Sequence, residues 1–124
     1  MSRSTYEDDL QRAVAQYLDL KGWLWCHVPN GARMGGKNPA RTGARMKGFG
    51  LKPGVPDVMI FEGWYVGEQY PHSGFGVAIE LKSPRGTVRP TQRKWLDGLK
   101  ARGWRVAVCR TLDEVVAVCE EIQA

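Results

Sequence analysis

Apolar and polar positions alternate along the chain in patterns that predict a helix, three strands, a second helix, a fourth strand and a last helix. Residues 4–21 have the apolar period of a helix, which Ser4 or Thr5 would cap and Gly22 would end. The apolar stripe of this helix consists of Tyr6, Leu10, Ala13, Val14, Tyr17 and Leu18. Short apolar runs predict strands over residues 23–28, 55–61, 75–83 and 104–109.

Two further helices are predicted on either side of the fourth strand. One has Pro90 in its first turn and stops at Gly103, and the other begins with a capping box of Thr111 and Glu114. Because a helix connects the third and fourth strands, these two strands are expected to be parallel. The elements together predict an α/β fold in which a mixed central sheet is flanked by helices.

The 124 residues are enough for one domain with its own core, which we expect to span residues 1–124. Two segments interrupt the regular pattern, a glycine-rich basic loop over 29–53 and a hairpin insert over 62–74. No apolar run approaches the roughly 20 residues that cross a bilayer, and the first residues do not resemble a signal peptide. We therefore expect a cytoplasmic protein without membrane contact.

Positive charge is concentrated in the middle of the chain. The net charge is +5, and the segment 31–56 contains six cations and no carboxylate. These cations are Arg33, Lys37, Arg41, Arg45, Lys47 and Lys52. Because phosphates are bound mainly by lysine and arginine, this segregation predicts a polyanion-binding surface, with an ordinary solvated loop as the alternative.

The cysteines and histidines show no metal-binding pattern. Cys26, Cys109 and Cys119 are odd in number, lie in apolar surroundings and form no CxxC pair, so we expect reduced core thiols. His27 and His72 are far apart in the sequence and lack ligand-like spacing, so neither is expected to bind a metal.

Three ionisable residues interrupt two apolar strands. Asp57 follows Pro56 at the start of one strand, and Glu80 and Lys82 leave the same face of the next. If these strands pair as a hairpin, the three charges converge beside apolar sheet, where an unpaired charge is costly. Two carboxylates with backbone or water oxygens suit Mg²⁺ or Mn²⁺, and Lys82 would then neutralise charge on a phosphate.

This pattern resembles the PD-(D/E)XK nuclease superfamily, and within it the VRR-NUC branch. The resemblance rests on Pro56-Asp57 and Glu80-Leu81-Lys82, on Glu7 in the first helix, on the glycine-rich loop and on Gln92 in the later helix. It extends from Thr5 to about Val116. One departure is that the family usually has a serine shortly before the glutamine, where this chain has Arg89 and Pro90.

The resemblance implies a restriction-endonuclease-like αβββαβ core followed by a C-terminal helix, and a divalent-metal-dependent, structure-selective endonuclease. It implies that Asp57, Glu80 and the Leu81 carbonyl bind the metal and that Lys82 is catalytic. Glu7, a further candidate ligand, and Gln92 would complete the site. Stand-alone members are similar to phage and bacterial enzymes that cut branched DNA, such as Holliday junctions, as homodimers. The six loop cations, with Arg85 and Arg89, are the candidate DNA contacts.

Other interpretations stay open at this point. The domain would alternatively be a non-catalytic nucleic-acid-binding module with the same fold, or a nuclease specific for flaps or nicks. A structural protein with a Glu80–Lys82 ion pair is a third alternative, but it leaves the carboxylate-free loop unexplained. For Glu7 the alternative is a capping box with Ser4, and for Gln92 it is a plain polar position in the first helical turn.

Overall fold

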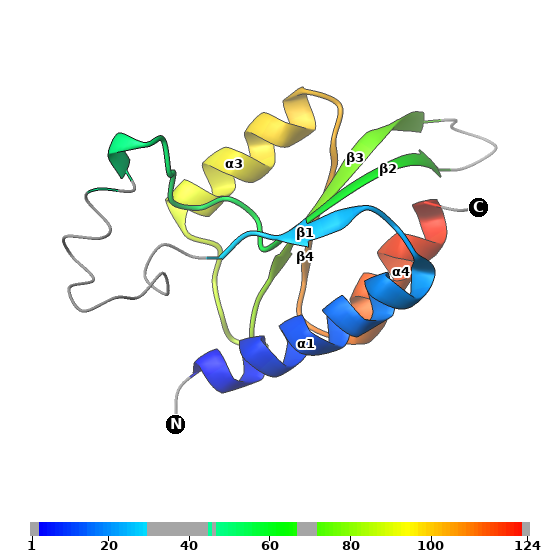
Figure 1. Ribbon diagram of the computed structural model, residues 1–124, viewed down its shortest axis with the longest axis horizontal. Helices are drawn as coiled ribbons and strands as arrows, with labels where there is room; N and C mark the ends of the chain where they lie inside the picture. The colour runs from blue at the N-terminus through cyan, green and yellow to red at the C-terminus, as the bar shows by residue number, and fades with distance from the viewer. Residues whose placement is uncertain (1–2, 30–44, 46, 67–71, 123–124) are drawn as a thin grey trace.

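A mixed β-sheet lies at the centre of the molecule, with helices on both of its faces (Figure 1). The computed structural model describes residues 3–29, 45, 47–66 and 72–122. The strands are β1 (Trp25–His27), β2 (Val58–Val66), β3 (His72–Leu81) and β4 (Arg105–Cys109), which lie in this order across the sheet. β2 pairs in antiparallel with β1 and β3, whereas β4 is parallel to β3. The predicted α/β fold and the parallel pair are therefore confirmed.

The helices create two apolar layers. α1 (Arg3–Lys21) and α4 (Leu112–Ile122) cover one face of the sheet, and α3 (Pro90–Ala101) covers the other (Figure 1). The larger cluster consists of Leu10, Val14, Leu18, Val58, Ile60, Val77, Ile79, Leu81, Cys109, Val115, Cys119 and Ile122. The smaller cluster, on the α3 face, contains Met59, Ala78 and Leu99. Within the described residues, no helix has the length and apolarity needed to cross a membrane.

The inner strand β3 is buried on both faces. Val77 and Ile79 belong to the larger cluster and Ala78 to the smaller one. Because side chains alternate along a strand, Glu80 lies on the α3 face together with Ala78. Only 3% of Glu80 is exposed. The sheet therefore holds a carboxyl group inside an apolar layer.

A β-bulge lies within the β2–β3 hairpin. Phe61 and Glu62 of β2 together oppose Gly76 of β3. Gly76 has a φ of +94°, and a Cβ atom there would lie 2.6 Å from the Trp104 ring. That ring is held edge-on against Phe61, with 5.9 Å between the ring centroids. Both the backbone and the packing therefore require glycine at this position.

The hairpin strands are longer than predicted. β2 continues to Val66 and β3 begins at His72, so most of the predicted insert over 62–74 is paired strand, with Trp64 opposite Gly74. Aromatic and β-branched residues favour strands, and the bulge lets the pairing continue beyond the irregular step. Residues 67–71 of the insert lie outside the described residues.

The helix caps were predicted with mixed success. α1 begins at Arg3, so Ser4 and Thr5 lie inside the helix and the expected cap is wrong. The apolar stripe starts only at Tyr6 and therefore does not determine the first turn. At α4 the predicted capping box is present: Glu114 N donates to Thr111 Oγ1 at 3.1 Å, and Thr111 N donates to Glu114 Oε1 at 3.2 Å.

The cysteines differ in their surroundings. Cys109 and Cys119 are buried free thiols, and burial raises the pKa of Cys109 to about 12 and that of Cys119 to about 11. The prediction of core thiols is therefore confirmed for these two. It is wrong for Cys26, which is exposed because β1 forms one edge of the sheet.

The basic loop predicted over 29–53 is described only in part. Residues 30–44 and 46 lie outside the described residues. Arg45, Lys47 and Gly48 have helical backbone, so the prediction of a continuous irregular loop is wrong here. Arginine and lysine have good helix propensity, which outweighs the neighbouring glycine at this position.

We predict that Gly76→Ala destabilises the protein by about 2–4 kcal/mol, because it adds overpacking against Trp104 to the strain of a positive φ. Gly103→Ala is the matched control, since Gly103 has a φ of +91° and open space around its Cβ position. The control should cost about 1 kcal/mol. Urea unfolding of both variants measures the difference, and equal losses would show that the Trp104 contact relaxes freely.

Candidate active site

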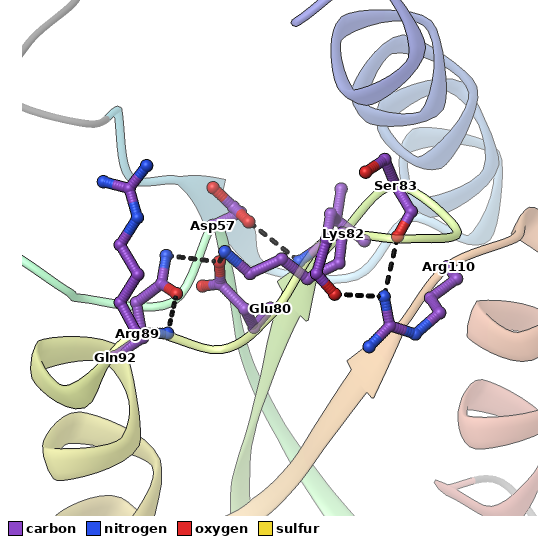
Figure 2. A network of polar contacts seen from close by, with 9 residues as sticks. Asp57, Glu80, Lys82, Ser83, Arg89, Gln92 and Arg110 are labelled. Carbon is purple, nitrogen blue, oxygen red and sulfur yellow. Dashed lines mark hydrogen bonds and ion pairs between the residues drawn. The ribbon is translucent and has the colours of Figure 1, made fainter. Parts of the chain in front are cut away.

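The β2–β3 hairpin brings Asp57 and Glu80 to the same end of the sheet, as the sequence predicted. Val58 pairs with Ile79, so the residues that follow outward on the two strands, Asp57 and Glu80, lie opposite each other. Leu81 N donates a hydrogen bond to Asp57 Oδ2 at 2.8 Å (Figure 2). The antiparallel register therefore places two carboxyl groups beside each other.

Glu80 is held by two partners that come from different elements. Gln92 Nε2, on α3, donates to Glu80 Oε2 at 2.9 Å. Lys82 Nζ lies 3.5 Å from the same oxygen, and both side chains of this ion pair are 4% exposed. Figure 2 shows the Lys82 and Gln92 side chains pointing toward the Glu80 carboxyl group. A buried charge of this kind is tolerated only when it is paired, as it is here.

Burial governs the protonation of the two carboxyl groups. Burial and, second, the charge of Asp57 raise the pKa of Glu80, Lys82 lowers it, and the net result is a pKa of about 8. Burial likewise raises the pKa of Asp57, against the hydrogen bond from the Leu81 amide and the charge of His27, which lower it. The positive charge of Lys82 is therefore too little to keep both carboxyl groups ionised at neutral pH.

The donor set suits a divalent cation. No group of three or more His, Cys, Asp or Glu side chains forms a ready-made metal site in the part of the chain that is described. Asp57 and Glu80 nevertheless supply two carboxylates. The Leu81 carbonyl lies on the Asp57 side of β3, because the N–H and C=O of a strand residue point to the same neighbour. Mg²⁺ binds through one or two carboxylates and otherwise keeps water ligands, so Asp57, Glu80 and this carbonyl fit it.

Gln92 is oriented by its own helix start. Gln92 Oε1 accepts a hydrogen bond from Arg89 N at 2.8 Å, which assigns the amide and points Nε2 at Glu80. Arg89 has no side-chain acceptor, so only the glutamine half of a capping box is present. Pro90 occupies the first helical position, where a missing N–H is harmless. The absent serine therefore does not prevent Gln92 from reaching the site.

A glycine joins the segment before Asp57 to this helix start. Gly54 has a φ of +89°, and a Cβ atom there would lie 2.5 Å from the backbone of Thr91. Pro56, between Gly54 and Asp57, is fully buried. The segment that leads into Asp57 therefore packs directly against the turn that contains Gln92. This contact fixes the position of Asp57 relative to Gln92.

The predicted residues meet at one pocket of about 350 Å³. Its lining includes Glu7, Asp57, Glu80, Leu81, Lys82, Arg89 and Gln92. Glu7 reaches the pocket from α1, and its charge raises the pKa of Asp57. The structure therefore brings together every residue that the resemblance implied for catalysis and metal binding.

Four other residues of this lining were not predicted. Asp8, Gln11 and Arg12 accompany Glu7 on α1, and Arg12 pairs with Asp9 at 3.2 Å. Positions 7, 8, 11 and 12 form a polar stripe at helical period, a signal that the sequence does contain. The fourth residue is His27, which was not expected to bind a metal.

His27 reaches the pocket through strand pairing. β1 places His27 opposite Val58, next to Asp57. His27 Nδ1 lies 2.9 Å from the Asp57 carbonyl oxygen. Because a carbonyl only accepts hydrogen bonds, Nδ1 must be the protonated nitrogen. Only the β1–β2 register reveals this position, because His27 and Asp57 are 30 residues apart.

The predicted DNA-contacting cations are spread over several surfaces. Arg33, Lys37 and Arg41 lie outside the described residues. Arg45 lies 5.6 Å from the Phe49 ring centroid, and Lys47 and Lys52 are exposed. Arg89 lines the pocket, and Arg85 is exposed in the turn that follows Lys82.

The Arg110 side chain forms hydrogen bonds with the turn that follows Lys82. Its Nη1 donates to the carbonyl oxygens of Ser83 and Gly86, both at 2.7 Å (Figure 2). Tyr6 in turn donates its hydroxyl to the Arg110 carbonyl at 2.6 Å, which explains why Tyr6 is 39% exposed despite its place in the apolar stripe. These bonds connect α1, the residue just after β4 and the turn that follows Lys82.

We predict that, in EDTA, stability falls as the pH rises from 5 to 8. The unfolded chain releases the Glu80 proton near the ordinary glutamate pKa of 4.5, whereas burial raises the pKa of Glu80 in the folded protein to about 8. The folded state therefore binds more protons in this window, and ionising Glu80 costs up to a few kcal/mol. Urea unfolding across this range measures the slope.

Glu80→Gln is the matched variant for this effect, because it cannot ionise and should flatten the slope. Mg²⁺ or Mn²⁺ should stabilise the parent protein more at pH 8 than at pH 5, since both ions bind carboxylates. A parent protein with the same pH dependence as Glu80→Gln would contradict the buried-acid assignment.

The chain is similar to known proteins of one family. The model of the VRR-NUC domain family matches residues 5–112. A solved structure described as a VRR_NUC domain protein matches with a TM-score of 0.70 and 22% sequence identity, covering 94% of this chain and 87% of that chain. This likeness supports the fold, and no curated protein matches the chain at a significant level. Because the family match includes Asp57, Glu80, Lys82 and most of the chain, the protein belongs to the VRR-NUC family of nuclease-type domains.

Proposed function

We propose that the protein is a divalent-metal-dependent endonuclease that hydrolyses phosphodiester bonds in DNA. The observation that supports this most directly is the convergence of Asp57, Glu80 and Lys82 in one pocket, with Glu80 held by Gln92. The VRR-NUC family match gives the nuclease class and a DNA substrate. Metal dependence is supported by two adjacent buried carboxyl groups, whose pKa values are raised by burial and would be lowered by a nearby cation.

The residues of the site have different chemical roles. Bound Mg²⁺ or Mn²⁺ supplies Lewis-acid polarisation of the phosphate and lowers the pKa of a water molecule. Asp57 and Glu80 would hold the ion, and Gln92 restrains the Glu80 side chain by its 2.9 Å hydrogen bond. Lys82, whose ammonium group lies 3.5 Å from Glu80 Oε2, would neutralise charge that builds up on the phosphate oxygens. Glu7 adds a further carboxylate from α1.

We propose selectivity for DNA structure, with branched DNA such as a four-way junction as the substrate. Binding through phosphates is supported by the exposed cations Arg45, Lys47 and Lys52 and by Arg89 at the pocket. Phosphate contacts position a protein on DNA without reading its sequence. A flap or a nicked duplex is the alternative substrate of the same site. The enzyme would act on DNA in the cytoplasm of a bacterial or phage-infected cell.

We predict metal-dependent cleavage of a labelled panel of four-way junction, flap, nicked duplex, plain duplex and single strand. Cleavage should disappear in EDTA, and Lys82→Ala should lower kcat by about 100-fold or more through lost electrostatic stabilisation. Lys100→Ala, an exposed lysine on α3 away from the pocket, is the control and should cleave normally.

Lys82→Ala should remain folded, because Glu80 can keep a proton when its partner is removed. Thermal melts and DNA binding of the variant check this. A folded parent protein that binds the panel but cuts none of it with either ion would indicate a non-catalytic binding module instead.

We further propose that the protein works as a homodimer. A 13.9 kDa monomer has little surface with which to hold two arms of a junction, whereas a two-fold pair presents two sites to two strands. Light scattering coupled to gel filtration should give about twice the monomer mass at micromolar concentration. A stable monomer that cuts junctions at the full rate would rule the dimer out.

A further inference from the structure

A second hollow lies beside α3, next to the active-site pocket but separate from it. Its volume is about 490 Å³, within the range of roughly 300–1,000 Å³ that small-molecule sites occupy. Gln92 lines the active-site pocket and the preceding residue, Thr91, lines this hollow. The two sites are therefore separated by the first turn of one helix.

Glycine at position 98 deepens the hollow. Glycine inside a helix costs about 0.5–1 kcal/mol relative to alanine, so it normally has a backbone or packing reason. Neither is visible for Gly98. Its φ is not positive, and among the described residues a Cβ atom there would meet only Arg102 Nη1, at an ordinary 3.6 Å. The same test at Gly54 and Gly76 gives contacts of 2.5 and 2.6 Å. What Gly98 provides is open space.

The walls of this space combine an aromatic ring with cations. Trp95 is half-buried against the smaller core cluster, and Leu99 is 9% exposed beside it. Arg102 Nη1 donates to the Gly98 carbonyl at 2.9 Å, which holds the guanidinium at the rim. Lys52 and Lys94 are the other cations of the lining.

The charge of the residues that line the hollow indicates which kind of molecule it would bind. No carboxylate is among the described residues that line it, although the active-site pocket a turn away contains several. An apolar hollow with an aromatic wall and a cationic rim matches a nucleotide, whose base stacks on aromatic side chains while its phosphates contact lysine and arginine.

We propose that this hollow receives an unpaired nucleotide of the DNA substrate, with the base beside Trp95 and its phosphates at Lys52, Lys94 and Arg102. This inference rests on the proposed nuclease function and adds a basis for its selectivity. A base inside a duplex is stacked and paired, and extruding it costs free energy, whereas a flap or an open branch point offers one already unstacked. Substrates with such a base close to the scissile bond are then favoured.

The test measures DNA binding by the Lys82→Ala protein in EDTA, where no cleavage is expected. One probe is a duplex with a short single-stranded flap that contains 2-aminopurine, and the second is the same duplex without the flap. Stacking against Trp95 should quench the 2-aminopurine fluorescence. Adding Gly98→Leu fills the hollow and should weaken flap binding about tenfold, as expected when one stacking contact is lost. Affinity for the plain duplex should stay the same.

Two further variants separate this effect from general damage. Gly98→Ala fills less of the space and should raise the melting temperature, because alanine is the better helix former, while weakening flap binding less than leucine does. Lys100→Ala, on the same helix but lining a different hollow, should leave both affinities unchanged.

Three results would overturn the proposal. Unchanged flap affinity in stable Gly98→Leu and Gly98→Ala proteins would show that the hollow is not used. Equal losses for flap and plain duplex would show that its cations contact only the duplex backbone. A folded Lys82→Ala protein that binds none of the DNA probes would remove the proposed function itself, and this loss would be seen before any Gly98 substitution is made.

Discussion

The burial of two adjacent carboxyl groups at the end of a hairpin is the constraint on which the rest of the site depends. Asp57 and Glu80 are placed together by backbone register, and burial raises the pKa of each. In a low-dielectric layer, one lysine does not neutralise two such groups. A proton on Glu80 relieves the excess negative charge, and in the proposed function a divalent cation would supply the same positive charge.

Most of the surrounding structure keeps that pair in place. β3 is covered on both faces, so Glu80 cannot turn outward to water. Gln92 fixes one oxygen of Glu80 and is itself fixed by the Arg89 amide, while Gly54 lets the chain before Asp57 pack against the same turn. The site is therefore positioned by backbone contacts and by two side-chain hydrogen bonds of Gln92.

Local patterns in the sequence were sufficient for the fold class, the motif and the hairpin that joins Asp57 to Glu80. They were insufficient wherever the answer depended on a neighbouring strand or helix. His27 enters the pocket only because β1 pairs with β2, and Cys26 is exposed only because β1 is an edge. The longer hairpin depends on a bulge opposite Gly76, which packs against Trp104, the residue just before β4. Each of these features is set by contacts between distant segments, which periodicity does not report.

The same distinction explains the charges around the site. The sequence shows that cations are concentrated in the middle of the chain. In the fold, lysine and arginine side chains line two adjoining hollows. The first contains the carboxyl groups that suit a metal ion, and the second has lysine, arginine and tryptophan without a carboxylate. Thr91 and Gln92 face different hollows from one helical turn. A DNA strand that approaches this turn would meet attraction for its phosphates on one side and an acidic pocket that needs a cation on the other. In the proposed function, metal binding and strand placement would therefore be electrostatically complementary, because a bound cation would remove the repulsion between the acidic pocket and the scissile phosphate.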